Sequence, residues 1–470
     1  MKKRYHILSL TASLLMLSSC DIEMVPKGQT TLETAQEIEY LLNEIHVSTD
    51  PGSDISILVN ESYGQEFSTV KQLINNTNTL LSSYLCYNEN LDRGNLASKD
   101  SRYTSIYSAI NTLNVALGKI DAATGEQSIK QKVIAEAHLK RAYLHFLAAN
   151  LYARQYDAAT ASQNGGIAYV DNYDMDQKQQ IPLDQVYERI LEDLDDKYID
   201  ALPSTASVTR CSRATGNAIK ARILFQMKRY QDALPYALKA LDSDYTIEDR
   251  LYMMDDYCWL LLPTSPNNFL YVASSNPSFW CPFADNLSRE TVAKFEDGDL
   301  TIDYGYAGYK EEGEEIWNGI YGEMSSGVEG CLSFSGWDTY KNPWGLTVES
   351  IMYVAAECYI RDNQIEKGLG YVNEIREHRI DPEKYVPFTA STVKEAMEEL
   401  QQAKFIEFLM TFENFFDRKR WNSEDEYKAT ITRDLPGIGT YSISPESPLW
   451  IMPFPIAVMQ TNPTFSQNYE

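Results

Sequence analysis

Apolar residues recur every three or four positions over long stretches of this chain, the spacing that one face of an α-helix produces. The clearest stripe lies between Lys130 and Tyr156 and consists of Ala135, Leu139, Ala142, Phe146 and Ala149. A second helix is predicted from about Leu183 to Leu202, because Pro203 follows and proline ends a helix. We expect these two helices to pack as neighbours in a mainly α-helical protein.

Two later segments share a pattern of helix, short break and helix. The first runs from Arg213 to Asp242 and the second from Thr347 to Arg379, and a shift of 135 residues superposes small residues such as Ala221 and Ala356. Small residues that recur where helices cross are typical of tetratricopeptide-like hairpins, whose repeats of about 34 residues fit this shift four times. The pattern predicts a scaffold of such helical hairpins.

The segment 251–346 between these hairpins has no sustained helical period and is rich in tryptophan, tyrosine and glycine. Glycines at this density predict turns and loops, and aromatic residues argue against disorder. An aromatic face can stack on a sugar ring while polar groups bind its hydroxyls. The candidate ligand contacts in this segment are Trp280, Tyr304, Tyr306, Tyr309, Trp317, Tyr321, Trp337 and Tyr340. For each ring, the alternative is that it packs the loops onto the helical body.

A second candidate patch combines aromatic and polar residues between two early helices. It consists of Tyr84, Tyr87, Asn88, Asn90 and Arg93. Asparagine and arginine offer planar donor groups that fit neighbouring hydroxyls of a sugar. A capped loop between two helices, without a ligand, is the alternative.

The N-terminus has the features of an export signal. Lys2 to Arg4 form a basic start, and residues 7–17 form an apolar run that is too short to span a bilayer. Residues 17–20 read Leu-Ser-Ser-Cys, as in a lipobox, where a peptidase cuts before the cysteine and its thiol is acylated. We therefore expect a signal peptide over 1–19, an acylated Cys20 and a tether over 20–30, on a membrane of a Gram-negative cell. Ordinary cleavage near Ser19, with Cys20 unmodified, is the alternative.

Charge and composition narrow the possible partners. The net charge of −26 becomes more negative when the signal peptide leaves, so nucleic acid is excluded as a partner and the lipid is the expected membrane attachment. The same charge favours a neutral or cationic ligand. No Pro/Gly/Ser-rich linker interrupts residues 31–470, which are predicted to form one body. The six other cysteines form no C-x-x-C pair, so disulfides and buried free thiols both stay open.

Catalytic and metal motifs are weak in this sequence. A glycosidase needs two carboxylates at a set separation, and runs such as Asp193-Leu194-Asp195-Asp196 or Glu314-Glu315 offer them, but a chain with 67 acidic residues has such runs on solvated faces. His138 and His145 lack an H-E-x-x-H motif or a third ligand. The chain is therefore not expected to be an enzyme. No cofactor is predicted, and a calcium ion held by loop acids stays open.

Five sequence motifs resemble, in order, those of the SusD/RagB family of outer-membrane nutrient-binding lipoproteins. They are Asp21 to Pro26 with Glu39 to Asn43, Tyr107 to Asn114, Ala135 to Tyr152, Glu407 to Trp421 with its Phe-Phe-Asp and Arg-Trp, and Trp450 to Asn468. The resemblance implies tetratricopeptide-like helix pairs with an irregular, loop-rich half packed on them. It also implies a surface protein that captures an oligosaccharide, or a peptide, and delivers it to a SusC-like TonB-dependent transporter. A purely scaffolding lipoprotein is a further alternative, which would leave the aromatic segment unused.

Overall fold

The structure, a computed structural model, describes residues 32–470 except 46, 48–52, 65–66, 98–99, 251–266, 273–286 and 301–341. The predicted signal peptide, the tether and most of the aromatic-rich segment lie outside the described residues, and the domain limits stay predictions. Within the described part, we find no helix with the length and apolar character needed to cross a membrane.

Helices make up most of the described chain, as the apolar spacing predicts. The earlier elements are α2 (Ala35–Leu41), η1 (Leu42–Glu44), α3 (Ser53–Leu58), α4 (Phe67–Asn75), α5 (Leu80–Leu85), α6 (Arg93–Leu96), α7 (Ser101–Ile120), α8 (Gln127–Tyr152), η2 (Ala161–Gln163), α9 (Leu183–Asp193), α10 (Asp196–Asp200), α11 (Arg213–Gln226) and α12 (Tyr230–Leu241). The later elements are β1 (Asn268–Leu270), α14 (Arg289–Val292), β2 (Leu346–Thr347), α16 (Val348–Arg361), α17 (Ile365–Glu377), α18 (Val393–Glu407), α19 (Phe412–Asn422), β3 (Ile431–Leu435), β4 (Gly439–Ile443), η4 (Pro448–Trp450) and α20 (Ile456–Thr461). The strands form two antiparallel pairs, β1 with β2 and β3 with β4.

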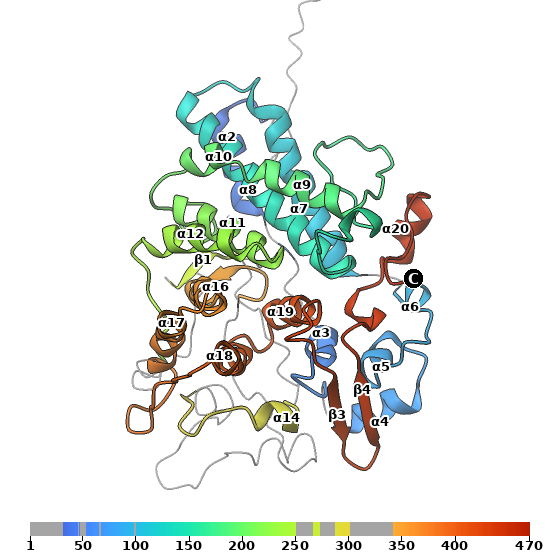
Figure 1. Ribbon diagram of the computed structural model, residues 1–470. Coiled ribbons are helices and arrows are strands. Elements are labelled where there is room, and N and C mark those ends of the chain that lie inside the picture. The colour runs from blue at the N-terminus through green and yellow to red at the C-terminus, as the bar shows by residue number, and fades with distance from the viewer. Residues whose placement is uncertain are drawn as a thin grey trace, which may run out of the picture.

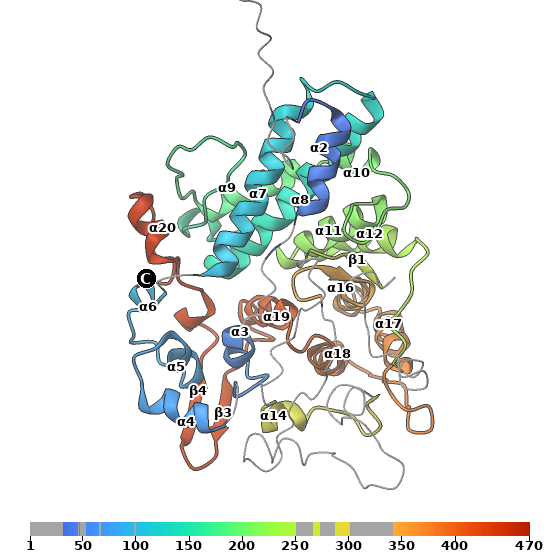
Figure 2. The ribbon, with the colours of Figure 1, turned by 180° about the vertical axis from the view of Figure 1, so that it is seen from behind.

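Helix pairs are stacked from one end of the molecule to the other (Figure 1). The pair α7 and α8 lies at the top, α11 and α12 follow, and α16 and α17 lie below them. Seen from behind, α2 lies along α7 and α8 (Figure 2). Helices α3 to α6 and the β3–β4 hairpin gather on one side of this stack, and α14 lies at its lower end.

Helix α8 carries the predicted apolar stripe, and all five of its residues are buried. Helix α9 packs against α8, as expected. The prediction of one helix from Leu183 to Leu202 is wrong in detail, because the chain forms α9 and α10 with a break at Leu194 and Asp195. The Asp195 carboxylate accepts a hydrogen bond from the backbone N–H of Lys197 and thereby begins a second helix.

The two predicted hairpins have the same turn. Lys228 between α11 and α12 has a φ of 63°, and Asn363 between α16 and α17 has a φ of 59°. In both turns the next residue donates its N–H to a carbonyl five positions back, a common way to end a helix. Small residues are required at the crossing, since a Cβ on Gly368 would lie 2.6 Å from the carbonyl oxygen of Ala356. The predicted repeat is confirmed.

Helix α19 crosses the middle of the stack and places charged side chains in its interior. Asp417 lies 2.6 Å from Lys404 Nζ of α18 and 3.1 Å from Arg420 Nη2. Glu357 of α16 accepts hydrogen bonds from Arg420 Nη1 at 2.6 Å and from the indole N–H of Trp421 at 3.2 Å. We call Glu357, Lys404, Asp417 and Arg420 the scaffold network. The Phe-Phe-Asp and Arg-Trp motif therefore holds helices together.

The C-terminal motif ties the end of the chain to α8. Asn468 donates from Nδ2 to the carbonyl oxygens of Tyr152 at 2.7 Å and Gly166 at 2.8 Å. Gln467 accepts a hydrogen bond from the backbone N–H of Phe454 at 2.8 Å. The amide side chains of this motif thus close the scaffold.

Candidate functional site

The eight aromatic candidates of the segment 251–346, from Trp280 to Tyr340, lie outside the described residues, as does Cys20. Their roles stay predictions. The structure does describe where this segment is attached, at 250, 267–272, 287–300 and from 342 onward. These attachment points define the platform on which the candidate site is built.

One side of the platform is the short β1–β2 pair. Asn342 donates from Nδ2 to Asn268 Oδ1 at 2.7 Å and to the carbonyl of Leu270 at 2.8 Å. Gly345 lies so close to β1 that an added Cβ would be 2.0 Å from the Leu270 carbonyl oxygen. The backbone can make this approach only because glycine has no side chain.

Trp344 is the deepest anchor of the platform, with a side chain that is fully buried. Its ring centroid lies 3.9 Å from that of Phe412 on α19, and its carbonyl accepts a hydrogen bond from the Tyr143 hydroxyl at 2.8 Å. This tryptophan packs against the scaffold, which is the alternative that the sequence left open for the rings of this segment.

Helix α14 is held from the opposite side by the turn after α3. The Ser288 hydroxyl donates to the carbonyl of Asn60 at 2.7 Å, and the Thr291 hydroxyl donates to the same carbonyl at 3.0 Å. The backbone N–H of Ser288 also donates to the carbonyl of Glu61 at 2.9 Å. Asn60 has a φ of 63°, which turns its carbonyl toward α14.

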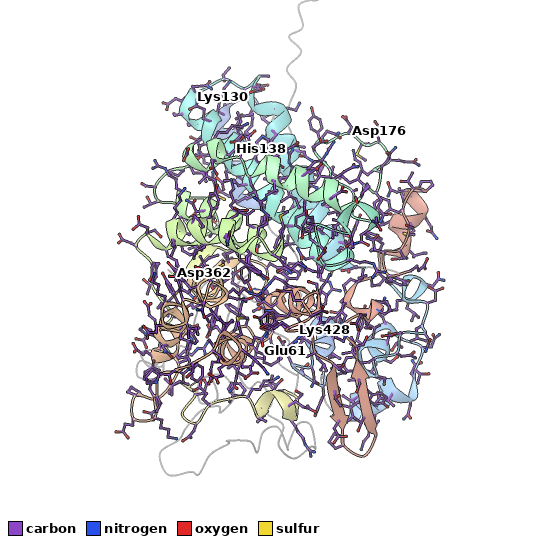
Figure 3. The ribbon with its side chains drawn as sticks, viewed as in Figure 1. Glu61, Lys130, His138, Asp176, Asp362 and Lys428 are labelled. Atoms are coloured by element: carbon purple, nitrogen blue, oxygen red, sulfur yellow. The ribbon has the colours of Figure 1, made fainter. Side chains whose placement is uncertain are left out.

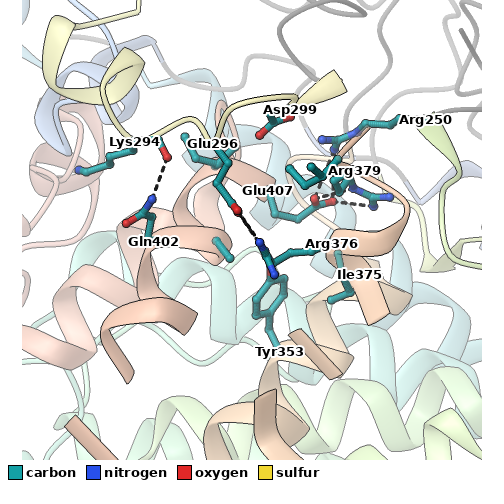
Figure 4. A pocket seen from close by; sticks show the side chains of 13 residues that line it. Arg250, Lys294, Glu296, Asp299, Tyr353, Ile375, Arg376, Arg379, Gln402 and Glu407 are labelled. Atoms are coloured by element: carbon teal, nitrogen blue, oxygen red, sulfur yellow. Dashed lines mark hydrogen bonds and ion pairs between the residues drawn. The ribbon is translucent and has the colours of Figure 1, made fainter. Parts of the chain in front are cut away.

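A buried group of charged residues joins three ends of the segment, and we call it the loop-end network. Its members are Glu248, Arg250, Glu349, Arg379 and Glu407. Arg379 donates from Nε to Glu407 at 2.8 Å (Figure 4). It also donates from Nη2 to Glu349 at 3.1 Å. Arg250 immediately precedes residues 251–266, while Asn267, which follows them, donates to Glu349 at 3.3 Å.

The same network reaches the next stretch of the segment through its backbone. The N–H of Leu300 donates to the Arg379 carbonyl at 2.8 Å, and Asp299 bridges to Ile380. The chain thus enters residues 301–341 from a point fixed on Arg379. A cavity of about 20 Å³ beside Arg379 and Glu407 has room for one water molecule and excludes a sugar ring.

The charges of the loop-end network do not balance, since three carboxylates face two guanidinium groups. Burial raises the pKa of Glu349; Arg379 opposes this shift, whereas Glu407 and Glu248 reinforce it. A proton on Glu349 would remove the excess charge. The three carboxylates each offer an oxygen within 4.8 Å of the others, as metal ligands do. Because Arg379 already binds two of them, the group fits an ion-pair network.

Three members of the second predicted patch lie in the interior. Tyr84 is fully buried, Tyr87 is 7% exposed and Arg93 is 1% exposed. The Arg93 guanidinium donates to the carbonyls of Ile451 and Pro448, both at 2.8 Å. These side chains stabilise the packing of early helices against the C-terminal segment, so they present no face to a ligand in this structure.

The other two members of the patch lie in the loop between α5 and α6. Asn90 is exposed and Asn88 is half-buried, and Asn88 Oδ1 accepts a hydrogen bond from the backbone N–H of Asn90 at 3.0 Å. Thr79 caps α5 and Asp92 caps α6. This is the capped loop that the sequence left as an alternative, and ligand contact by the two asparagines stays a prediction.

The two histidines and Asp193, the buried member of the aspartate run, serve packing in the upper layer, where Figure 3 labels His138. Asp193 accepts from both Arg141 Nε and Nη2 at 2.7 Å, and it lies 2.7 Å from His138 Nδ1. Burial lowers the pKa of His145 to about 3. Its neutral ring lies between the Arg141 carbonyl and the N–H of Val170. Among the described cysteines, Cys86, Cys211 and Cys358 are free thiols.

A groove that the sequence did not predict lies beside the N-terminus of α11 and has a volume of about 690 Å³. Its hydroxyl-bearing and charged lining residues include Ser204, Thr205, Ser207, Thr209, Arg213, Lys239, Asp242 and Asp244. A volume of this size is typical of small-molecule sites. No motif marks these residues, because the fold brings together the connection between α10 and α11, the end of α12 with the residues that follow it, and β1.

Comparison with known proteins decides the fold family. Residues 23–225 match the SusD-like family described as starch-binding and associating with the outer membrane. A SusD superfamily protein of Bacteroides thetaiotaomicron has a TM-score of 0.69 and 15% sequence identity, with 93% of this chain and 99% of that chain covered. The chain has a SusD-like fold. No match to it was found among curated proteins.

Two further solved structures with this fold carry descriptions of what those proteins bind. A putative sugar binding protein of Bacteroides vulgatus has a TM-score of 0.66 and 14% identity, covering 94% of this chain and 99% of its own. Surface glycan-binding protein A of Bacteroides uniformis has a TM-score of 0.64 and 15% identity, covering 93% and 99%. The identities are low, so these likenesses establish the fold, and the match to the family ends within α11, before the aromatic-rich segment.

Proposed function

We propose that this chain is a lipid-anchored surface protein of the outer membrane that captures an oligosaccharide and delivers it to a SusC-like TonB-dependent transporter. The supporting observation is a SusD-like fold over 93% of the chain, shared with proteins described as sugar- and glycan-binding. It binds its ligand without changing it. A peptide is the alternative ligand within the same architecture.

The aromatic-rich segment is the proposed ligand surface. Its rings would stack on sugar rings, with Asn88 and Asn90 as a second, smaller contact region. Removing one stacking ring should cost roughly 1 to 3 kcal/mol of binding free energy, which is enough to abolish weak binding. The test is calorimetry with a panel of glycans and peptides, using the wild type and alanine variants at Trp280, Trp317 and Trp337.

Circular dichroism on the same samples establishes that each variant is folded. Unchanged affinity in all three variants would move the site away from these rings, and binding to peptides alone would favour the alternative ligand. Incubation with polymeric glycans, followed by an assay for new reducing ends, separates a binder from a glycosidase. New ends would contradict the proposal.

The lipid anchor is tested by protease treatment of intact cells, with Cys20→Ala as the comparison. We expect the wild type to be digested at the surface and the alanine variant to leave the membrane fraction. Protection of the wild type, or a membrane-bound alanine variant, would contradict the proposed location.

The partner is tested by purification from detergent extracts. A protein that passes ligand to a transporter needs a broad contact surface, of the order of 2,000 Å² in total, and such an interface survives dilution. We expect a SusC-like transporter to co-purify. Its absence would favour a scaffolding lipoprotein.

A further inference from the structure

Two basic residues near α14 lack the acidic partners that Lys404 and Arg420 have in the scaffold network. Lys294 follows α14, Arg418 lies on α19, and both side chains are half-buried. Neither side chain has a hydrogen bond or an ion pair with any residue that the structure describes. Each cation lies near an aromatic ring: Lys294 Nζ lies 4.2 Å from the ring centroid of Phe405, and Arg418 Cζ lies 5.5 Å from that of Trp421.

The two cations lie close enough to affect one another. Burial lowers the pKa of Lys294, the charge of Arg418 lowers it further, and Glu290 and Glu61 oppose this without restoring it. Burial also lowers the pKa of Arg418, which only Asp417 offsets. A desolvated cation without a bound anion is unfavourable, so this arrangement is better suited to a state in which an anion is present.

The elements that carry these cations meet at one place. Gln402 of α18 donates to the Lys294 carbonyl at 3.1 Å, and Asn414 of α19 donates to the Phe405 carbonyl at 2.8 Å. In Figure 4 the Lys294 side chain points away from Glu296 and Glu407, the acids of the adjoining cavity. The acids of that cavity therefore do not neutralise it.

Two amide side chains without hydrogen-bond partners in the described part of the chain lie one helical turn from Phe405 and from Arg418. Asn422 lies one turn after Arg418 on α19, and Gln401 lies one turn before Phe405 on α18, so helical spacing puts each amide on the same face as its neighbour. Gln401 Nε2 and Asn422 Nδ2 are buried and have no hydrogen-bond partner among the described residues. Buried donors normally have a hydrogen-bond partner. Here two cations and two amides have none among the described residues.

We propose that Lys294 and Arg418 bind the carboxylate of an acidic oligosaccharide, one that contains uronate sugars. This inference rests on the proposed function and narrows its ligand. The planar fork of Arg418 matches a carboxylate, Lys294 adds a point charge, and the amides add neutral donors. The net charge of −26 does not prevent this, because exposed charges are screened beyond about 8 Å at physiological ionic strength.

The experiment compares three probes by calorimetry: trigalacturonate, its methyl ester, and a neutral galactose trisaccharide. The variants Lys294→Met and Arg418→Met remove each charge and keep the length of the side chain, whereas Lys294→Arg keeps the charge. Lys367→Met is the matched control, because Lys367 is exposed and its Nζ also lies near a ring, 5.3 Å from the centroid of Tyr359. Thermal melts establish that every variant is folded.

We expect trigalacturonate to bind the wild type at least about tenfold more tightly than its methyl ester, since a hydrogen bond to a charged group contributes more than a neutral one. Each methionine variant should lose about tenfold in affinity for the acid, while Lys294→Arg and Lys367→Met keep it. Equal affinity for acid and ester, or wild-type affinity in both methionine variants, would overturn the inference.

The probes also separate this inference from the proposed function. Binding of the neutral trisaccharide alone, unaffected by either variant, would leave the proposed function intact and overturn the carboxylate site. If none of the three probes and no other glycan of the panel binds, the oligosaccharide function itself is overturned together with the inference.

Discussion

The scaffold network and the loop-end network are both buried groups of acids and basic residues, but they are assembled in different ways. All members of the scaffold network lie on helices. Glu357 accepts hydrogen bonds from Arg420 and Trp421, which lie on a single turn of α19. In the loop-end network, Glu248, Arg250 and Arg379 come from connections between helices. One network joins helices to helices, and the other joins the helices to the ends of the candidate ligand segment.

The two networks shift the pKa of a buried glutamate in opposite directions. The pKa of Glu357 is lowered: burial raises it, but Arg420 and Arg361 outweigh that effect. The pKa of Glu349 is raised, because burial and two neighbouring acids outweigh Arg379. The basic residues of the scaffold network thus neutralise its carboxylates. Those of the loop-end network do not neutralise all three of its carboxylates.

The largest expected effect is on the scaffold network. Glu357→Gln leaves Arg420 buried beside a neutral group and should cost about 3 to 5 kcal/mol in the free energy of unfolding. Urea denaturation measures this loss. Glu398→Gln is the control, because the Glu398 side chain is exposed and its distance to Lys394 is 3.8 Å. If both variants unfold at the same urea concentration, the scaffold network does not stabilise the fold.

Arg379→Met tests whether the loop-end network acts locally. Loss of the guanidinium should release the segment ends, so amide exchange at Leu300 and Asn267–Val272 should speed up by about tenfold or more. Exchange at the centre of α8 should stay slow. Equal acceleration in α8 would mean that the two networks unfold together, which would contradict the distinction between them.

The difference between the networks also explains what the sequence could predict. The helices, the repeat of hairpins and the place of the Phe-Phe-Asp motif follow from spacing, because neighbours on a helix face are three or four residues apart. Glu349 and Arg379 are not three or four residues apart on one helix, and only the tertiary fold brings them together. The one visible signal was a glutamate in the otherwise uncharged first turn of α16.

The candidate site was harder to predict for the same reason. The side chains of Tyr84, Tyr87 and Arg93 suit a sugar, but the residue type does not reveal whether a side chain is buried. In the fold all three are buried. Lys294 and Arg418 carry no motif, and what distinguishes them is the lack of a partner among the described residues. Only a structure reports such a deficit.

The free energy of unfolding should depend on pH in opposite ways for the two networks. Each glutamate should change it by roughly 1 kcal/mol or more, the free energy that corresponds to a tenfold change in proton affinity. A lowered folded pKa means that the contribution of Glu357 is present above the unfolded pKa, near 4.5, and is lost as the pH falls. A raised folded pKa means that the contribution of Glu349 is present below 4.5 and is lost as the pH rises. Unfolding free energies from pH 3 to 8 for Glu357→Gln and Glu349→Gln measure both.

Relative to the wild type, Glu357→Gln should therefore lose most at neutral pH, while Glu349→Gln should be equally or more stable there. If Glu349→Gln were strongly destabilised at pH 7, the carboxylate would be ionised and satisfied, and the imbalance of the loop-end network would be refuted.

The smallest expected effect lies between the networks, on α19 itself. Arg418 and Arg420 are two residues apart, yet Arg420 meets Glu357 and Asp417 while Arg418 has no ion pair with a described residue. Arg418→Met should not lower the free energy of unfolding by more than about 0.5 kcal/mol, because no carboxylate is left behind without a partner. Arg420→Met should instead lose about 3 to 5 kcal/mol, since it removes a buried cation that contacts both Glu357 and Asp417. Thermal and urea unfolding of the two variants give the comparison directly. A loss of more than about 2 kcal/mol in Arg418→Met would mean that this arginine supports the fold, and the carboxylate site would then have to rest on Lys294 alone.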